Sequence, residues 1–192
     1  MEIESIRDEL IRLAREDGDV CQRLAEDGSL FDGYNPLMAL VHRRNGDRLE
    51  QIVDVVGWPG VRLVGEDGAD AAWLLLKHAI GQPELQRRML PLVQAAVAAG
   101  DVPAWHAATL EDGIAFYEGR PQCYGTMADW DEQGVMRPWT IDDPDGVDQR
   151  RAAVGLPPLH RQFEDTPERP PGDPAQRLRD ADQWARSVGW RD

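Results

Sequence analysis

The spacing of apolar residues along the chain predicts a succession of helices. Residues 3–27 repeat apolar side chains every three or four positions between acids and arginines, which is typical of an amphipathic helix, with Gly18 as its weakest point. Residues 36–56 form a second helical stretch, and we expect an interruption at Asn45-Gly46 because an Asn-Gly pair commonly turns the chain. The Gly-Trp-Pro-Gly connection at 57–60 is expected to be a tight turn.

The middle of the chain is the most apolar part. Residues 69–80 are apolar on almost every side, which predicts a central helix surrounded by others. Helices are expected at 84–99 and 103–117, each followed by a glycine that ends it. The helical period is then lost up to about residue 141, where glycine, proline and aromatic residues indicate irregular chain or a short hairpin.

These elements predict a mainly α protein, a compact multi-helix domain with an irregular or short-hairpin segment around 119–141. We expect residues 1–160 to form this single helical domain, with a last short helix within 142–154. The Pro-rich and charged residues 161–173 are expected to be a linker or a surface strap. Residues 174–192 repeat apolar positions at helical spacing, so a C-terminal helix should dock on the domain.

Charge narrows the classes of partner. The chain has 192 residues, 35 acidic and 21 basic, for a formal net charge of −14. Nucleic acid and anionic membranes are excluded as main partners, because phosphate binding depends on clustered Lys and Arg. No apolar leader or membrane span is evident in the sequence, so we expect a cytoplasmic monomer or homodimer. Its two cysteines, Cys21 and Cys123, show no ligand spacing and are expected to be free thiols.

Of the 21 basic residues 20 are arginines, so Lys77 is the only lysine. The excess of Arg, Ala, Gly, Asp and Pro resembles the coding bias of a high-GC bacterium. Lys77 precedes His78 near the end of the central helix, where helical geometry places at least one of the two against the core. Burial favours the neutral form of either side chain, so each is a candidate general base. Alternatively, His78 is a satisfied core histidine and Lys77 extends to the surface from the helix end.

A second group of polar residues follows the helix 103–117. Arg120, Gln122, Tyr124 and Thr126 lie between glycines in a segment without helical period, which suits a pocket rim that hydrogen-bonds a polar ligand. The alternative is a structural glycine-rich turn. Asp112 precedes this segment and is either a functional acid or a solvated one.

Other candidate site residues are less informative about function. Trp58, in the connection at 57–60, is a candidate wall for a ligand or a core-filling residue. The histidines show no HxxxH, HExxH or HxD spacing, and no cofactor motif is present. We therefore expect neither a metal nor another cofactor.

Several short motifs occur in the order found in one bacterial family. That family has a Gly-Trp-Pro turn, a Gln-His-Ala-Asp stretch on a helix, an Asp-Arg pair, a Gln-x-Tyr-Gly-Thr-Gln segment and a late Arg-x-x-x-Gly-Leu. The matching residues here are Gly57–Pro59, His78-Ala79, Asp112, Gln122–Thr126 and Arg151–Leu156. Over about residues 35–160 the chain thus resembles domain of unknown function 6624, as a divergent member. The family name implies no activity.

Three polar positions of these motifs differ from the family pattern. Lys77 stands where the pattern has Gln, Gly113 where it has Arg, and Met127 where it has the last Gln. The differences indicate either relaxed function on a retained scaffold or a site rebuilt for a new substrate. If the segments converge, losing Arg beside Asp112 and gaining Lys beside His78 moves a positive charge within one cavity.

The sequence favours a small cofactor-independent enzyme that acts by general acid–base chemistry on a polar, anionic small molecule. His78 or an unprotonated Lys77 would be the base, and Asp112 would orient it or accept the proton. Substrate-binding roles are predicted for Gln122, Tyr124, Thr126, Arg120 and Trp58. The expected reaction is hydrolysis, elimination or ring closure, in bacterial specialised metabolism. The alternative is a non-catalytic binding or immunity-type protein whose acidic surface recognises a basic partner.

Overall fold

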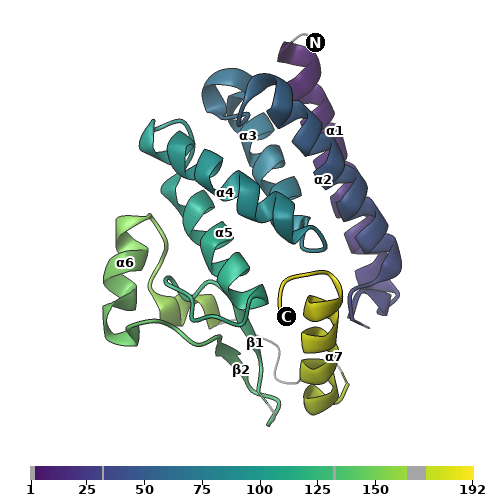
Figure 1. The fold of residues 1–192 in the computed structure, drawn as a ribbon, viewed down its shortest axis with the longest axis vertical. Coiled ribbons are helices and arrows are strands. Elements are labelled where there is room, and N and C mark those ends of the chain that lie inside the picture. Colours follow the sequence, from purple (N-terminus) through teal and green to yellow (C-terminus); the bar gives the residue numbers. More distant parts are fainter. Residues whose placement is uncertain (1–2, 32, 132, 164–171) are drawn as a thin grey trace. The chain divides into compact units, whose positions relative to one another are not determined.

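The computed structural model describes residues 3–31, 33–131, 133–163 and 172–192, and this part of the chain contains seven α-helices and one two-stranded sheet (Figure 1). The predicted mainly α fold class is confirmed. Contacts divide the chain into two compact units, residues 1–102 and residues 103–192. The boundary between the units falls inside the stretch 1–160 that the sequence assigns to one domain.

The first unit is a bundle of four helices. These are α1 (Ile3–Glu26), α2 (Pro36–Val56), α3 (Val61–His78) and α4 (Pro83–Ala98), with a short 3-10 turn, η1 (Ser29–Phe31), before α2. Helix α3 contacts α1, α2 and α4, so it is the central helix that its apolar sequence predicts. It is kinked at Gly65, which has φ 72° and a non-helical conformation. Within the described residues, no helix is long and apolar enough to cross a bilayer.

The interruption predicted at Asn45-Gly46 is wrong. Helix α2 runs unbroken through both residues, and both are buried. A Cβ on Gly46 would overlap the Gln82 side-chain oxygen and lie 3.0 Å from a methyl of Leu85. Glycine therefore leaves room beside α2 for these two side chains, and long-range packing overrides the local preference of the pair for a turn.

The core of the first unit is built from one apolar stripe on each helix. Side chains at three- and four-residue spacing point inward and are almost fully buried. The main contributors are Ile6, Leu10 and Leu13 on α1, Met38, Leu49 and Ile52 on α2, Ala72, Leu75 and Leu76 on α3, and Leu85, Met89 and Val93 on α4. These stripes matter for function because polar residues take some of their positions.

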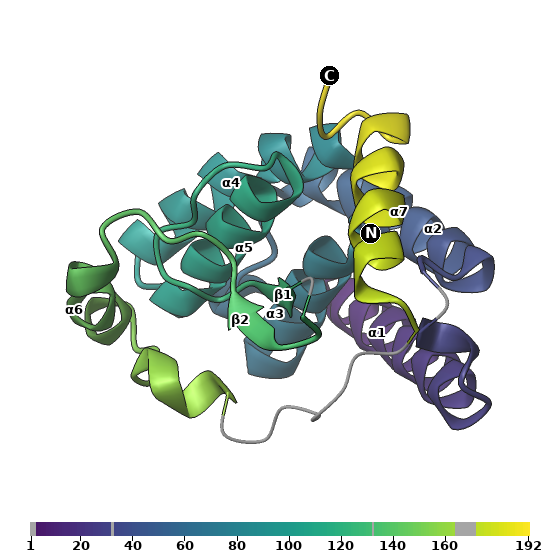
Figure 2. The same cartoon turned by 90° about the horizontal axis from the view of Figure 1, so that it is seen from below.

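The second unit begins with α5 (Ala104–Tyr117) and continues with an antiparallel hairpin of β1 (Ala128–Trp130) and β2 (Met136–Pro138). Ala128 pairs with Pro138 and Trp130 with Met136. The segment between α5 and the hairpin folds back beside α5 (Figure 2). The short hairpin was one of the two alternatives that the sequence left open for this region.

The rest of the second unit consists of η2 (Pro144–Gly146), α6 (Val147–Ala153), η3 (Leu159–Phe163) and α7 (Pro174–Ser187). Of the predicted linker or strap at 161–173, residues 164–171 lie outside the described residues. After α7, Arg191 donates hydrogen bonds to the carbonyl oxygens of Tyr117 and Phe116, at 2.7 and 3.0 Å. The C-terminal segment is thereby joined to the end of α5.

Candidate functional site

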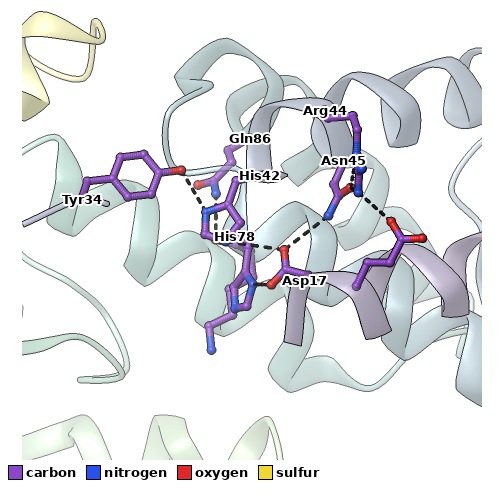
Figure 3. Close-up of polar contacts among 9 residues, drawn as sticks. Asp17, Tyr34, His42, Arg44, Asn45, His78 and Gln86 are labelled. Carbon is purple, nitrogen blue, oxygen red and sulfur yellow. Dashed lines mark hydrogen bonds and ion pairs between the residues drawn. The ribbon is translucent and has the colours of Figure 1, made fainter. Parts of the chain in front are cut away.

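Buried polar residues from several helices of the first unit meet around one carboxylate. Asp17 continues the apolar stripe of α1 and is 1% exposed. His42 and Asn45 take core positions on α2, and Gln86 takes one on α4. Figure 3 shows these side chains together with His78, the last residue of α3. Buried polar groups need partners, so the contacts within this cluster decide what it can do.

The shortest contact of the cluster joins Asp17 and His78. The Nδ1 atom of His78 lies 2.8 Å from Oδ1 of Asp17 (Figure 3). The carboxylate is almost fully buried, whereas the His78 side chain is 29% exposed. One side of the imidazole is therefore held by a buried acid while the side chain retains access to solvent.

The ionisation of Asp17 determines which imidazole nitrogen carries hydrogen. Burial alone raises the pKa of this carboxyl, but its contacts with His42 and His78 outweigh burial and hold the pKa well below the ordinary range. An ionised carboxylate only accepts hydrogen bonds. We therefore assign the hydrogen of neutral His78 to Nδ1, which leaves a lone pair on Nε2.

His42 approaches the same carboxylate from α2. Its Nε2 atom lies 3.5 Å from Oδ2 of Asp17, and it is a buried atom with no hydrogen bond to any described residue. Its other nitrogen, Nδ1, lies 2.9 Å from the hydroxyl of Tyr34. The side-chain amide of Asn45 donates to Oδ2 of Asp17 at 3.3 Å, and Arg44 donates to the side-chain oxygen of Asn45 at 3.1 Å. Asp17 is thus surrounded by two imidazoles and an amide.

Gln86 holds the end of α3 in place. Its side-chain amide donates to the carbonyl oxygens of Leu76 and Lys77, at 2.9 and 3.2 Å. The last carbonyls of a helix have no partner within the helix, and this buried amide supplies one. His78 therefore lies at a fixed helix end, where the negative pole of the helix dipole favours a cation.

Lys77 precedes His78 and is exposed, with its Nζ atom 5.2 Å from the centre of the Trp73 ring. This distance is within the range of a cation–π contact. Although the residue as a whole is exposed, its ammonium is partly buried, which lowers the pKa of Lys77. Among the described residues, no acid lies within ion-pair distance of this ammonium. The only lysine of the chain is thus a cation without a carboxylate partner among the described residues.

Asp112 belongs to the second unit and has a different environment. Its carboxylate is fully buried and accepts hydrogen bonds from the backbone N–H groups of Cys123, Tyr124 and Thr126, at 2.8 to 3.0 Å. The Thr126 hydroxyl donates a further bond at 2.9 Å. All of these contacts fix the loop after α5, so the structure engages Asp112 as an anchor for the backbone.

The other polar residues predicted in this segment are also engaged within the second unit. Gln122 is fully buried, donates to the carbonyls of Met127 and Trp139 and accepts from the Met127 N–H. Arg120 is exposed and paired with Glu118. Tyr124 is partly buried, and burial raises the pKa of its phenol. These contacts favour the alternative of a structural glycine-rich turn for most of the segment.

Three further residues were considered from the sequence: Trp58 and the two cysteines. Trp58 lies in the connection between α2 and α3, and its indole nitrogen is buried without a hydrogen bond to a described residue. Cys21 and Cys123 are free thiols, as the sequence predicts. Burial raises the pKa of Cys123, which makes its thiol a weak nucleophile.

Of the predicted site residues, the structure places Lys77, His78 and Trp58 in the first unit, and Asp112, Arg120, Gln122, Tyr124 and Thr126 in the second. Four residues of the cluster were not predicted as site residues from the sequence: Asp17, His42, Asn45 and Gln86. One signal was available: each occupies a position of an apolar helical stripe, as Asp17 does after Ile6, Leu10 and Leu13. A polar residue on a core stripe is costly unless paired, which marks it as a candidate.

Comparison with known proteins gives a family but no activity. No curated protein and no solved structure matches the chain. One family model, described as a family of unknown function (DUF6624), matches residues 4–166, a range that includes Asp17, His42 and His78. The match spans most of the chain, so the protein belongs to the family DUF6624, as its motifs predict.

Proposed function

We propose that the protein is an enzyme in which His78, oriented by Asp17, transfers a proton of a polar, anionic small molecule. The observation that carries this proposal is the 2.8 Å contact between a buried carboxylate and a partly exposed imidazole. A base held by a third group at its far nitrogen is a recurring arrangement in acid–base catalysis. The function is assigned from this geometry, since the family has no known activity.

The chemistry follows from the hydrogen on Nδ1. Neutral His78 accepts a proton from the substrate at Nε2 and becomes an imidazolium. Ionised Asp17 stabilises this cation directly, and the C-terminal end of α3 stabilises it through the helix dipole. The imidazolium then returns the proton to a leaving group. Elimination, ring closure and hydrolysis all use this pair of transfers.

Lys77 supports an anionic substrate. Lys77 directly precedes His78 in the sequence, and no described acid pairs with its ammonium. An unpaired cation at a helix end attracts a carboxylate or phosphate group, and an ionic hydrogen bond contributes about 1.5–3 kcal/mol. We assign this binding role to Lys77 and the proton transfer to His78, because only His78 contacts an orienting acid.

The orienting role that the sequence gives to Asp112 passes to Asp17 in this proposal. Asp112 already accepts bonds from three backbone N–H groups and one hydroxyl. A carboxylate used in this way holds a loop and has little capacity left to orient a base. Gln122 and Thr126 are likewise occupied by contacts within the second unit.

The proposal is tested by substrate depletion. The protein, freed of metal ions with a chelator, is incubated with the anionic fraction of a metabolite extract from a high-GC bacterium, and mass spectrometry follows which compounds disappear. The variant His78→Ala should convert the same compound at least about 100-fold more slowly, the lower end of what a general base contributes. Asp17→Asn should slow conversion to a similar extent, because an amide can donate as well as accept and so no longer fixes the tautomer of His78 or stabilises its cation.

A matched control separates catalysis from folding. His160→Ala replaces an exposed histidine outside the cluster and should convert the compound like the wild type. Thermal unfolding of each variant shows whether the fold is kept. Equal conversion by His78→Ala and the wild type would contradict the proposal. Conversion by none of the proteins would favour the non-catalytic binding function instead.

A further inference from the structure

The Asp17–His78 contact leaves one buried atom of the cluster unexplained. Proton transfer by His78 requires Asp17, and His42 contributes to it only by helping to keep that carboxyl ionised. Yet His42 is 8% exposed, and its Nε2 atom is buried, faces Asp17 and makes no hydrogen bond to a described residue (Figure 3). Its contact with Asp17 at 3.5 Å is an ion pair without a hydrogen bond, and a buried nitrogen without a hydrogen bond is costly, so its position favours a ligand.

The donor set around this atom suits a transition-metal ion. Asp17, His42 and His78 each offer one ligand atom, and these atoms all lie within 4.8 Å of one another. Zinc binds imidazole nitrogen and carboxylate oxygen at about 2.0–2.2 Å, which places two tetrahedral ligands about 3.4 Å apart. The observed Nε2–Oδ2 and Nδ1–Oδ1 separations are 3.5 and 2.8 Å. Small side-chain movements would therefore admit an ion.

The surrounding residues orient the ligands as a metal site requires. Nδ1 of His42 and the Tyr34 hydroxyl share a hydrogen bond, and in a metal-bound site the hydroxyl would accept from Nδ1, which would leave the Nε2 lone pair of His42 for the ion. Asn45 donates to Oδ2 of Asp17 and so restrains the carboxylate. Gln86 fixes the end of α3 that carries His78. Each of the three ligands is thus held in position by one neighbouring side chain: His42 by Tyr34, Asp17 by Asn45, and His78 by Gln86.

The negative charge of the cluster and its exposure to solvent also favour a metal ion. Asp17 is buried, and none of the described Arg and Lys residues forms an ion pair with it. A divalent cation would compensate this buried negative charge. The His78 side chain is 29% exposed, which gives the cluster an open side. Three protein ligands with one open position are the arrangement of catalytic zinc sites, whereas closed structural sites have four.

We propose that Asp17, His42 and His78 form a binding site for a first-row divalent cation of the Zn²⁺ class. The ion takes the place of the hydrogen between Nδ1 of His78 and Asp17, and this hydrogen moves to Nε2 of His78, so the metal-bound site and the metal-free pair are alternative states of the same side chains. Inhibition of proton transfer by bound Zn²⁺ follows from this and rests on the proposed function. Binding itself does not depend on that function.

The site is tested by titrating the metal-free, full-length protein with ZnCl₂ in a calorimeter, without any substrate. We expect one Zn²⁺ per chain, and the visible spectrum of the Co²⁺ form should be that of a low-coordinate site. His42→Ala should weaken binding at least about 100-fold, more than loss of an orienting neighbour alone. His160→Ala, the matched control, should bind like the wild type.

One further variant keeps the test decisive. Tyr34→Phe retains all three ligands but removes the partner of His42, and should weaken binding about 10–100-fold. Equal affinity of His42→Ala and the wild type, or no stoichiometric binding by the folded wild type, would overturn the site. If His42→Ala does not fold, unchanged affinity of Tyr34→Phe overturns it. Since Tyr34→Phe keeps Asp17, His42 and His78, weakened Zn²⁺ binding with retained turnover in this variant separates the site from the proposed function.

Discussion

Replacing Asp112 is predicted to destabilise the second unit strongly. Asp112→Ala removes the acceptor of three backbone N–H groups, those of Cys123, Tyr124 and Thr126, and of the Thr126 hydroxyl. The carboxylate is fully buried, so the loop must rearrange before water can replace it. The change therefore leaves several buried donors without partners at once.

The size of the effect follows from the number of donors. A buried donor left without its acceptor costs about 1–3 kcal/mol. The summed cost of four donors is an upper limit on the lost stability. Single substitutions are measured to cost much less than this sum, because the loop relaxes and water reaches some of the donors. We expect a loss of about 3–5 kcal/mol in the free energy of unfolding, the range found when a buried ionic network is broken. Asp112→Asn keeps one acceptor oxygen and should fall between Ala and the wild type.

The measurement is urea unfolding followed by tryptophan fluorescence, since Trp130 and Trp139 lie in or beside the hairpin that the loop leads to. Asp145→Ala, an exposed acid in η2, is the control and should change stability by less than about 0.5 kcal/mol. A loss below about 1 kcal/mol for Asp112→Ala would refute the assignment of Asp112 as a backbone anchor.

Three further predictions concern packing, pH and substrate binding. Gly18→Ala should stabilise α1 by about 0.5–1 kcal/mol because nothing lies within 4 Å of the new methyl. Gly46→Ala should lower the stability of the fold because its methyl meets the side chains of Gln82 and Leu85. Chemical denaturation of both variants measures the two changes. Burial and Asp129 raise the pKa of Tyr117 to about 12 from 10.0, so the unfolded chain loses this proton first. Stability should fall by about 2–3 kcal/mol between pH 10 and 12, and an equally steep fall in Tyr117→Phe would contradict this cause. Lys77→Met should raise KM about 10–100-fold for an anionic substrate with little change in kcat, and an unchanged KM would remove the binding role of Lys77.

The helices were largely predictable from the sequence because their apolar period is local. The apolar surface of 69–80 indicated the central helix, and α3 does contact three neighbours. The break expected at Asn45-Gly46 failed because the reason for that glycine lies about 40 residues away, at Gln82 and Leu85. Local turn preference carries no information about side chains from a distant segment that pack against the glycine.

The candidate site was only partly predictable. His78 stood out through its place on an apolar helix and through a family motif. Its partner Asp17 lies on α1, and His42 lies on α2, so no short spacing joins the three residues. Metal and catalytic motifs that are read from sequence depend on residues close together in one element. A cluster assembled from three helices becomes visible only when the helices are packed.

The central claim, that buried Asp17 orients His78, is tested most directly by nuclear magnetic resonance of the imidazole nitrogens. Two-bond nitrogen–proton spectra of the metal-free protein with ¹⁵N-labelled histidine report which nitrogen of neutral His78 carries hydrogen. We predict hydrogen on Nδ1 in the wild type, and loss of this preference in Asp17→Asn. Hydrogen on Nε2 in the wild type, or identical spectra of His78 in the two proteins, would contradict the account.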